Sequence, residues 1–220
     1  MIRLSFGAPR NEARRILCLG AHADDIEIGC GGTLLQLLQD DPETVVRWVV
    51  FSAQEERARE ARQSAAAFLR DAGDAEVTVA SFTDGFFPYE GDSIKRFFEA
   101  ELKSFAPDVV FTHHREDRHQ DHRVVSDLTW NTFRDHLILE YEIPKYDGDL
   151  GQPNVYMPLS ASICQEKVSA LTDHFVSQHD KHWFDEETFR AHLRLRGVEA
   201  ATRYAEAFHG RKMCLQGGPA

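Results

Sequence analysis

The chain has 220 residues, of which 42% are hydrophobic and 28% are charged, and its formal net charge at pH 7 is −11. This charge argues against a broad nucleic-acid surface, because phosphate binding needs clustered Lys and Arg. No apolar run approaches the roughly 18 residues of a membrane span, and residues 1–15 lack the apolar core of a signal peptide. We therefore expect a cytoplasmic protein with one α/β domain over residues 1–220.

The amino-terminal part combines a strand pattern with a group of acidic and histidine side chains. Apolar residues 16–19 predict a buried strand, and the glycine-rich residues 29–33 predict a turn that opens a helix at residues 34–38. Between them, residues 21–27 have the sequence Ala-His-Ala-Asp-Asp-Ile-Glu. Open α/β sheets keep their active sites beyond the carboxyl ends of the strands, and this segment is expected to lie there.

The rest of the chain alternates strand and helix patterns. Strands are predicted at residues 45–52, 76–81, 108–112, 137–141 and 154–159, and helices at residues 55–69, 93–105, 120–136, 165–175 and 186–194. This order predicts a Rossmann-like α/β fold, with a mostly parallel sheet and helices on both faces. The loop at residues 144–158 is too long for a simple connection, so we expect a carboxyl-terminal extension that covers a substrate site.

A second polar motif follows the strand at residues 108–112. Residues 113–122 contain four histidines and three carboxylates, far more than a solvated charged segment requires. His119 and His122 are three residues apart at the start of a predicted helix and therefore share a face. Catalytic zinc usually has three ligands of the His and carboxylate type, with one position left for water. The two motifs together supply such a set, namely His22, Asp25 and His122.

Further polar residues adjoin this ligand set. Asp24 neighbours a ligand and is free to act as a general base toward a water molecule. His119 lies on the other side, and Asp121 is available to orient its second ring nitrogen. His113 and His114 directly follow the strand, and we expect them to line the wall of the site.

The motif Ala-His-x-Asp-Asp-x-Glu-x-Gly-Cys-Gly-Gly-Thr-Leu, which begins at Ala21, is followed downstream by His-x-Asp-His, which begins at His119. Together the two motifs resemble the LmbE-like or PIG-L superfamily of zinc-dependent N-acetyl-sugar deacetylases. The α/β pattern between them strengthens the resemblance, since a single motif would be much less specific. The chain departs from the family where Ala23 and Gln120 replace common prolines, and neither change removes a ligand.

The resemblance implies a mechanism and a partner. Zinc would be held by His22, Asp25 and His122. Asp24 would be the general base of amide hydrolysis, His119 would protonate the leaving amine or steady the oxyanion, and Asp121 would hold His119. The substrate would be an N-acetylglucosamine-type sugar or sugar conjugate. Its hydrolysis would release acetate and leave a free amine on the sugar. Similar family members form trimers or hexamers, which implies a homo-oligomer.

Substrate contacts are less well determined by the sequence. Arg57 and Glu60 form an Arg-x-x-Glu element that often lies near the substrate in the family, but they could equally form a surface ion pair on a helix. Tyr146 and Trp183 could stack on a pyranose face. Three polar residues could bond its hydroxyl groups, namely Gln178, His179 and Glu206. Oligomer packing is the rival use of this surface.

Two other classes of function stay open. One is a metal-dependent hydrolase of another amide or ester bond, although two-metal phosphoesterases normally need more bridging carboxylates than Asp25 alone. The other is a nucleotide- or metal-binding module without chemistry. A dinucleotide fingerprint needs G-x-G-x-x-G, and Leu34 stands where the third glycine belongs. The presence of Asp24 and His119 beside a filled metal site favours catalysis.

Overall fold

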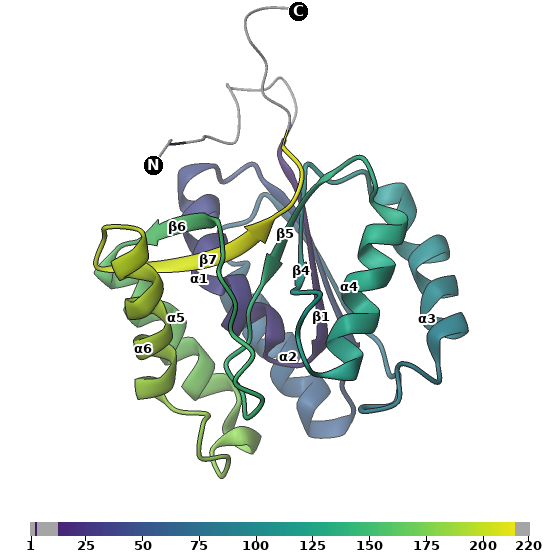
Figure 1. The fold of residues 1–220 in the computed structure, drawn as a ribbon. Coiled ribbons are helices and arrows are strands. Elements are labelled where there is room, and N and C mark those ends of the chain that lie inside the picture. Colours follow the sequence, from purple (N-terminus) through teal and green to yellow (C-terminus); the bar gives the residue numbers. More distant parts are fainter. Residues whose placement is uncertain (1–2, 4–12, 214–220) are drawn as a thin grey trace, which may run out of the picture.

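The computed structural model describes Arg3 and residues 13–213, and their fold is shown in Figure 1. Within these residues one sheet contains all the strands, in the order β3-β2-β1-β4-β5-β7-β6. The strands are β1 (Arg15–His22), β2 (Val45–Ser52), β3 (Asp74–Val79), β4 (Val109–His113), β5 (Leu137–Tyr141), β6 (Val155–Leu159) and β7 (Tyr204–Gly210). Strands β1 to β5 pair in parallel, whereas β7 is antiparallel to both β5 and β6.

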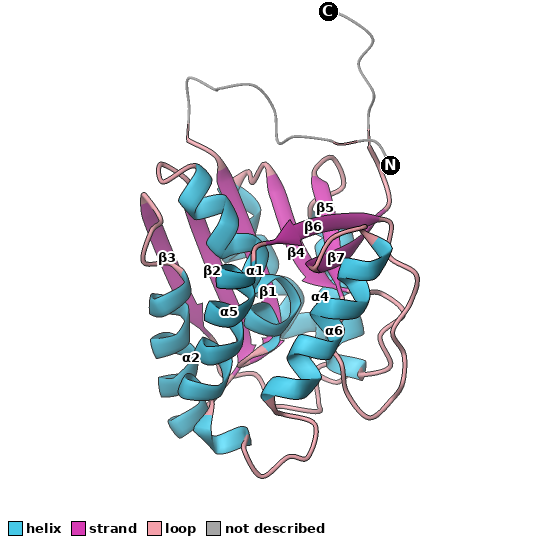
Figure 2. Ribbon diagram, turned by 90° about the vertical axis from the view of Figure 1, so that its left-hand side faces the viewer, coloured by secondary structure: helices cyan, strands magenta, loops and turns pink. Residues whose placement is uncertain are grey.

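Helices cover both faces of this sheet. They are α1 (Asp25–Asp40), α2 (Glu55–Phe68), α3 (Gly91–Phe97), α4 (Gln120–Thr132), α5 (Ala161–His174) and α6 (Glu186–Glu199). One buried core joins the sheet to α1, α2, α5 and α6, and a second core joins the opposite face to α3 and α4 (Figures 1 and 2). The predicted Rossmann-like, mostly parallel α/β fold is confirmed.

Most predicted elements agree with the structure to within a few residues at their ends. The predicted helix at 93–105 is divided, because α3 is followed by a π-helical turn at Phe98–Leu102 and a 3₁₀ turn at Lys103–Phe105. The predicted helix at 120–136 ends at Thr132, and the sequence pattern did not indicate β7. No helix among the described residues is long and apolar enough to cross a membrane.

The prediction of a turn at residues 29–33 was wrong, because α1 begins at Asp25 and continues through these glycines. The glycines permit close packing inside the molecule. A Cβ on Gly29 would lie 2.2 Å from Cδ2 of Tyr141, and one on Gly31 would lie 2.6 Å from Cε1 of Phe68. Only glycine therefore leaves room for the neighbouring side chains at these positions. The helix forms there although glycine has a low helix propensity.

Substitution of Gly29 by Ala should destabilise the protein. Tyr141 is fully buried, and its hydroxyl donates a hydrogen bond of 2.6 Å to the Leu19 carbonyl, so the ring cannot move away freely. We expect the cost of overpacking, about 1–3 kcal/mol, to exceed the gain of about 1 kcal/mol in helix propensity. Urea unfolding would measure the change in the free energy of unfolding. Gly91→Ala is the control, since nothing lies within 4 Å of a Cβ at that position. Equal stability of the two variants would contradict this account.

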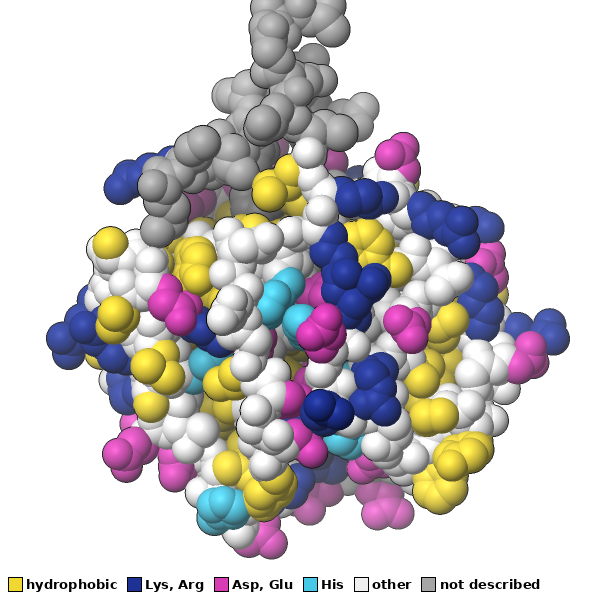
Figure 3. Space-filling view, viewed as in Figure 1, with side chains coloured by type: hydrophobic (Ala, Val, Ile, Leu, Met, Phe, Trp, Pro, Cys, Tyr) yellow, Lys and Arg dark blue, Asp and Glu magenta, His cyan; other side chains and the backbone are white. Residues whose placement is uncertain are grey.

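The carboxyl ends of the parallel strands face two long loops. The loop between β5 and β6 and the loop between α5 and α6 both extend to this edge, which is the lower edge in Figure 1. The space-filling view in the orientation of Figure 1 shows basic side chains interleaved with acidic and apolar ones (Figure 3). The carboxyl edge is therefore the place where strand ends and covering loops meet.

Candidate active site

A cavity of about 680 Å³ opens at this carboxyl edge. It is bounded by the segments that follow β1, β2, β3 and β4, by the loop between β5 and β6, and by the loop between α5 and α6. Its lining includes most of the predicted site residues, namely His22, Asp24, Asp25, Arg57, His119, His122, Tyr146, Gln178 and Trp183. The fold thus brings both sequence motifs and part of the carboxyl-terminal extension to one cavity.

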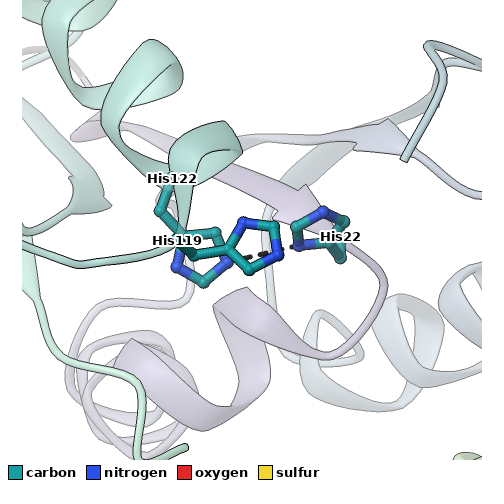
Figure 4. A group of neighbouring side chains, drawn as sticks. All are labelled: His22, His119 and His122. Atoms are coloured by element: carbon teal, nitrogen blue, oxygen red, sulfur yellow. Dashed lines mark hydrogen bonds between the residues drawn. The ribbon is translucent and has the colours of Figure 1, made fainter. Parts of the chain in front are cut away.

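Three residues in this cavity have donor atoms that are spaced as ligands of one ion. His22 Nδ1 is 3.2 Å from His122 Nε2 and 3.4 Å from Asp25 Oδ2. His122 Nε2 is 3.5 Å from Asp25 Oδ1. Donor atoms about 2.0–2.1 Å from a tetrahedral zinc ion would lie about 3.3–3.4 Å apart. Two imidazoles and one carboxylate at these distances therefore fit a divalent metal. A dashed line in Figure 4 marks the close approach of His22 to His122.

Both histidines of this set have carboxylates at their outer ring nitrogens. His122 Nδ1 lies 2.9 Å from Asp117 Oδ2, and His22 Nε2 lies 3.2 Å from Asp121 Oδ2 and 3.1 Å from Asp84 Oδ1. Such partners fix the tautomer that presents the inner nitrogen to a metal. Burial is the main reason that the pKa of His122 falls to about 4, so this imidazole is neutral at pH 7, as a ligand must be.

Asp24 is held beside the ligands in an uncommon backbone conformation. It is the N-cap of α1, and its φ of 99° lies in the left-handed region, which costs energy for a residue with a side chain. Its Oδ2 accepts a hydrogen bond of 2.9 Å from Arg57 Nη2. Burial raises the pKa of its carboxyl group to about 6, although Arg57 opposes this shift. A carboxylate with a pKa near neutrality suits a general base.

Arg57 and Glu60 do not form a simple surface pair, and of the two only Arg57 lines the cavity. Arg57 lines the cavity, but it also donates to Asp24 and to the Ala23 carbonyl, and its Nη1 lies 3.2 Å from Glu60 Oε2. Glu60 is buried outside the cavity and accepts hydrogen bonds of 2.9 and 2.6 Å from the amide and hydroxyl of Ser177. This chain of contacts joins Asp24 to the loop that follows α5.

The Asp121 carboxylate does not contact His119. It accepts hydrogen bonds from the amides of Gly85, at 2.7 Å, and Phe87, at 3.2 Å, and it approaches His22. Its place in the first turn of α4 points the fully buried side chain toward the loop before α3. His119 instead caps α4, since its Nδ1 accepts a hydrogen bond of 3.3 Å from the Asp121 amide. The structure therefore places the Asp121 carboxylate beside His22 and not at the ring of His119, where it was predicted to lie.

The tautomer of His119 follows from this cap. Because Nδ1 accepts a hydrogen bond, the proton of a neutral ring must lie on Nε2. Burial and the neighbouring His22 lower the pKa of His119. A neutral ring that can donate from Nε2 suits hydrogen bonding to an oxyanion better than it suits acid catalysis.

Sequence reasoning missed several residues around the ligands. Asp117 lies at the outer ring nitrogen of His122, and Lys145 contacts Asp117. In the sequence, only their presence in polar segments could have indicated them. His113 is fully buried and stacks on His122 with ring centres 3.9 Å apart, so it supports the site from behind and does not line its wall. His114 lines a separate cavity with His209. The expectation that both histidines form the cavity wall was therefore wrong.

The predicted sugar contacts have different surroundings. Tyr146 and Trp183 line the cavity mouth, and Tyr146 is 69% exposed with its ring 5.0 Å from that of His182. Gln178 also lines the cavity. Glu206 does not, because it is buried in an ion pair with Lys167.

The fold and the donor set define a class of protein: a Rossmann-like α/β protein with a possible His and Asp metal site at the carboxyl edge of its sheet. The family model named PIG-L, described as GlcNAc-PI de-N-acetylase, matches residues 17–133. The chain belongs to this family of deacetylases. It is also 30% identical over 177 residues to the uncharacterized deacetylase YaiS of Escherichia coli, an alignment that covers 74% of this chain and 92% of YaiS.

Solved structures share the fold at lower sequence identity. The N,N'-diacetylchitobiose deacetylase of Pyrococcus horikoshii has a TM-score of 0.70 and 21% identity, with 90% of this chain and 84% of that chain covered. The 4-carboxy-2-hydroxymuconate hydratase of Pseudomonas putida has a TM-score of 0.72 and 16% identity, with 94% and 100% covered. Since one is a deacetylase and the other a hydratase, the fold alone does not determine the reaction.

Proposed function

We propose that this protein is a zinc-dependent N-deacetylase that removes the acetyl group from an N-acetylglucosamine-type sugar or sugar conjugate. The observation that carries the proposal is the position of Asp24, a buried carboxylate with a raised pKa beside two imidazoles and one carboxylate at metal-ligand spacing. Deacetylases in the same family support the reaction type, and the chitobiose deacetylase with the same fold supports a sugar substrate.

Each residue would have a separate part in the reaction. His22, Asp25 and His122 would hold the zinc ion, which when bound supplies Lewis-acid catalysis of carbonyl hydrolysis. Asp24 would accept a proton from the attacking water, and Arg57 would keep its carboxylate in place.

His119 would complete this arrangement by donating a hydrogen bond from Nε2 to the developing oxyanion. Asp121 would act indirectly, by holding the outer nitrogen of His22. The proton for the leaving amine would come from Asp24 after it has accepted one from water, since the neutral His119 is a poorer acid.

The sugar would lie between the ligands and the covering loops. Trp183 and Tyr146 line the cavity, and their aromatic rings would stack against apolar faces of a pyranose. Gln178 offers both a donor and an acceptor for hydroxyl groups. A cavity of about 680 Å³ is within the usual range for small-molecule sites.

Acetate release from a panel of N-acetylated sugars and sugar nucleotides tests this proposal. The zinc-loaded protein should release acetate from at least one member, chelator-stripped protein should not, and added zinc should restore the activity. If no member reacts while zinc is bound in stoichiometric amount, the proposed N-deacetylation is wrong. A parallel panel of other amides and esters would then identify a hydrolase of another bond.

A further inference from the structure

Lys145 lies in the loop between β5 and β6, yet its side chain is directed inward and is only 9% exposed. Its Nζ is 2.9 Å from Asp117 Oδ2, and 2.7 and 2.5 Å from the two carboxylate oxygens of Asp149. It also lies 3.4 Å from the Ile143 carbonyl. An ammonium group has three N–H donors, and these contacts are sufficient to use them all. Although Lys145 lines the cavity, its ammonium group is therefore committed to the protein.

Asp117 links this lysine to the candidate metal site. The oxygen that Lys145 contacts, Oδ2, is also the atom that lies 2.9 Å from His122 Nδ1. The other oxygen accepts a hydrogen bond of 2.8 Å from the His119 amide. Asp117 is nearly fully buried, and a buried carboxylate needs both hydrogen bonds and an opposite charge. Lys145 supplies such a charge directly.

We propose that Lys145 is a positioning residue, which acts through Asp117 to hold the imidazole of His122 in the orientation that binds metal. This inference rests on the metal-dependent function proposed above. Its physical basis is that the carboxylate partner of a ligating histidine fixes the ring and sets its basicity, so loss of that partner weakens metal binding. Asp149 in turn fixes Lys145, and it also accepts a hydrogen bond of 2.7 Å from the Arg118 amide. The covering loop is thereby fastened to the segment that precedes α4.

Metal affinity of the stripped protein is the appropriate measurement, because it does not depend on the identity of the substrate. Zinc and cobalt would be titrated into wild type and into Lys145→Met, with calorimetry for both ions and visible absorption for cobalt. We expect Lys145→Met to bind metal about tenfold more weakly or worse. Lys145→Arg should restore most of the affinity, because it returns a cation to Asp117. Lys103→Met, which removes an exposed lysine paired with Glu99 on the surface, is the matched control and should not change the affinity.

A second variant separates positioning from general stability. Asp149→Asn retains Lys145 but weakens its attachment to the loop, so it should weaken metal binding in the same direction and by less than Lys145→Met. Thermal unfolding of each metal-free variant would establish that it is folded. Wild-type affinity in folded Lys145→Met or Asp149→Asn would overturn the inference, even if the variant melts at a lower temperature.

The outcome is separable from that of the proposed function. If wild type binds zinc and Lys145→Met binds it weakly, the role of Lys145 is supported even when no sugar is deacetylated. If sugars are deacetylated but the lysine variants retain full metal affinity, the role of Lys145 is refuted and the deacetylase proposal stands. If Lys145→Met raises KM without a change in metal affinity, Lys145 contacts substrate and the positioning role is wrong. A wild-type protein that binds no metal overturns both.

Discussion

Replacement of Asp24 by Asn should reduce kcat by roughly 10²- to 10⁴-fold, the usual contribution of a positioned general base. The expected loss is large because an amide cannot accept the proton of the attacking water, although the asparagine side chain would keep the size and most of the packing of the aspartate. Metal binding should persist, since Asp24 is outside the proposed ligand set. In contrast, His22→Ala should lose the metal as well, because it deletes a donor.

Steady-state acetate release and zinc stoichiometry, measured on the same preparations, would separate these two effects. Asp40→Asn is a suitable control, since this exposed aspartate at the end of α1 is far along the same helix. Unchanged kcat in the Asp24→Asn protein would show that another group accepts the proton. Loss of zinc from that protein would instead place Asp24 among the ligands.

Lys167→Met should lower the free energy of unfolding by about 3–5 kcal/mol, the usual cost of leaving a buried charge without its partner. Lys167 Nζ lies 2.5 Å from Glu206 Oε1 and 2.6 Å from the Ile28 carbonyl, and both side chains are almost fully buried. Glu206 also accepts hydrogen bonds of 2.8 and 2.6 Å from the amides of Gly32 and Thr33. The ion pair therefore forms hydrogen bonds with backbone carbonyl and amide groups on successive turns of α1.

The physical reason can be tested by a second substitution. In Lys167→Met combined with Glu206→Gln, no uncompensated charge is left, and the carbonyl oxygen of the new glutamine can still accept from the α1 amides, so part of the lost stability should return. Urea unfolding of both variants and of Lys103→Met, which removes an exposed lysine, would measure the difference. A loss in Lys167→Met no larger than that in Lys103→Met would contradict the role assigned to the buried pair.

Strands β1, β2 and β4 were predictable because each contains a short apolar run and is followed by a helix. Strands β2 and β5 were predicted with the ends that the structure gives them. Helix α1 was mispredicted because glycine is a turn signal in a sequence, whereas here Gly29 and Gly31 allow Tyr141 and Phe68 to approach. Such contacts between distant residues have no local signature.

The proposed metal ligands were predictable from the sequence, but the contacts that hold each side chain were not. The ligand set came from residue types at a motif spacing, and the structure gives their donor atoms compatible distances. The partner of each side chain was not predictable, because it depends on where a carboxylate points within a turn. Asp121 is next to His122 in sequence, but Asp117 is the residue that contacts its ring. One residue expected to bond sugar hydroxyls, Glu206, is instead buried by its pairing with Lys167.

The contacts from Asp24 through Arg57 and Glu60 to Ser177 have a consequence for how such proteins diversify. The loop between α5 and α6 cannot be exchanged independently of the site. Ser177 in this loop donates hydrogen bonds to Glu60, which contacts Arg57, and Arg57 in turn holds the proposed base. A loop grafted from a relative would have to supply an equivalent of Ser177, or Arg57 would lose part of its anchorage. Under the proposed function, new substrate ranges would arise more readily through residues at the cavity mouth such as Tyr146, which is outside this chain of contacts. Recombination at the loop boundaries and point mutation at the mouth should therefore differ sharply in how often they yield active proteins.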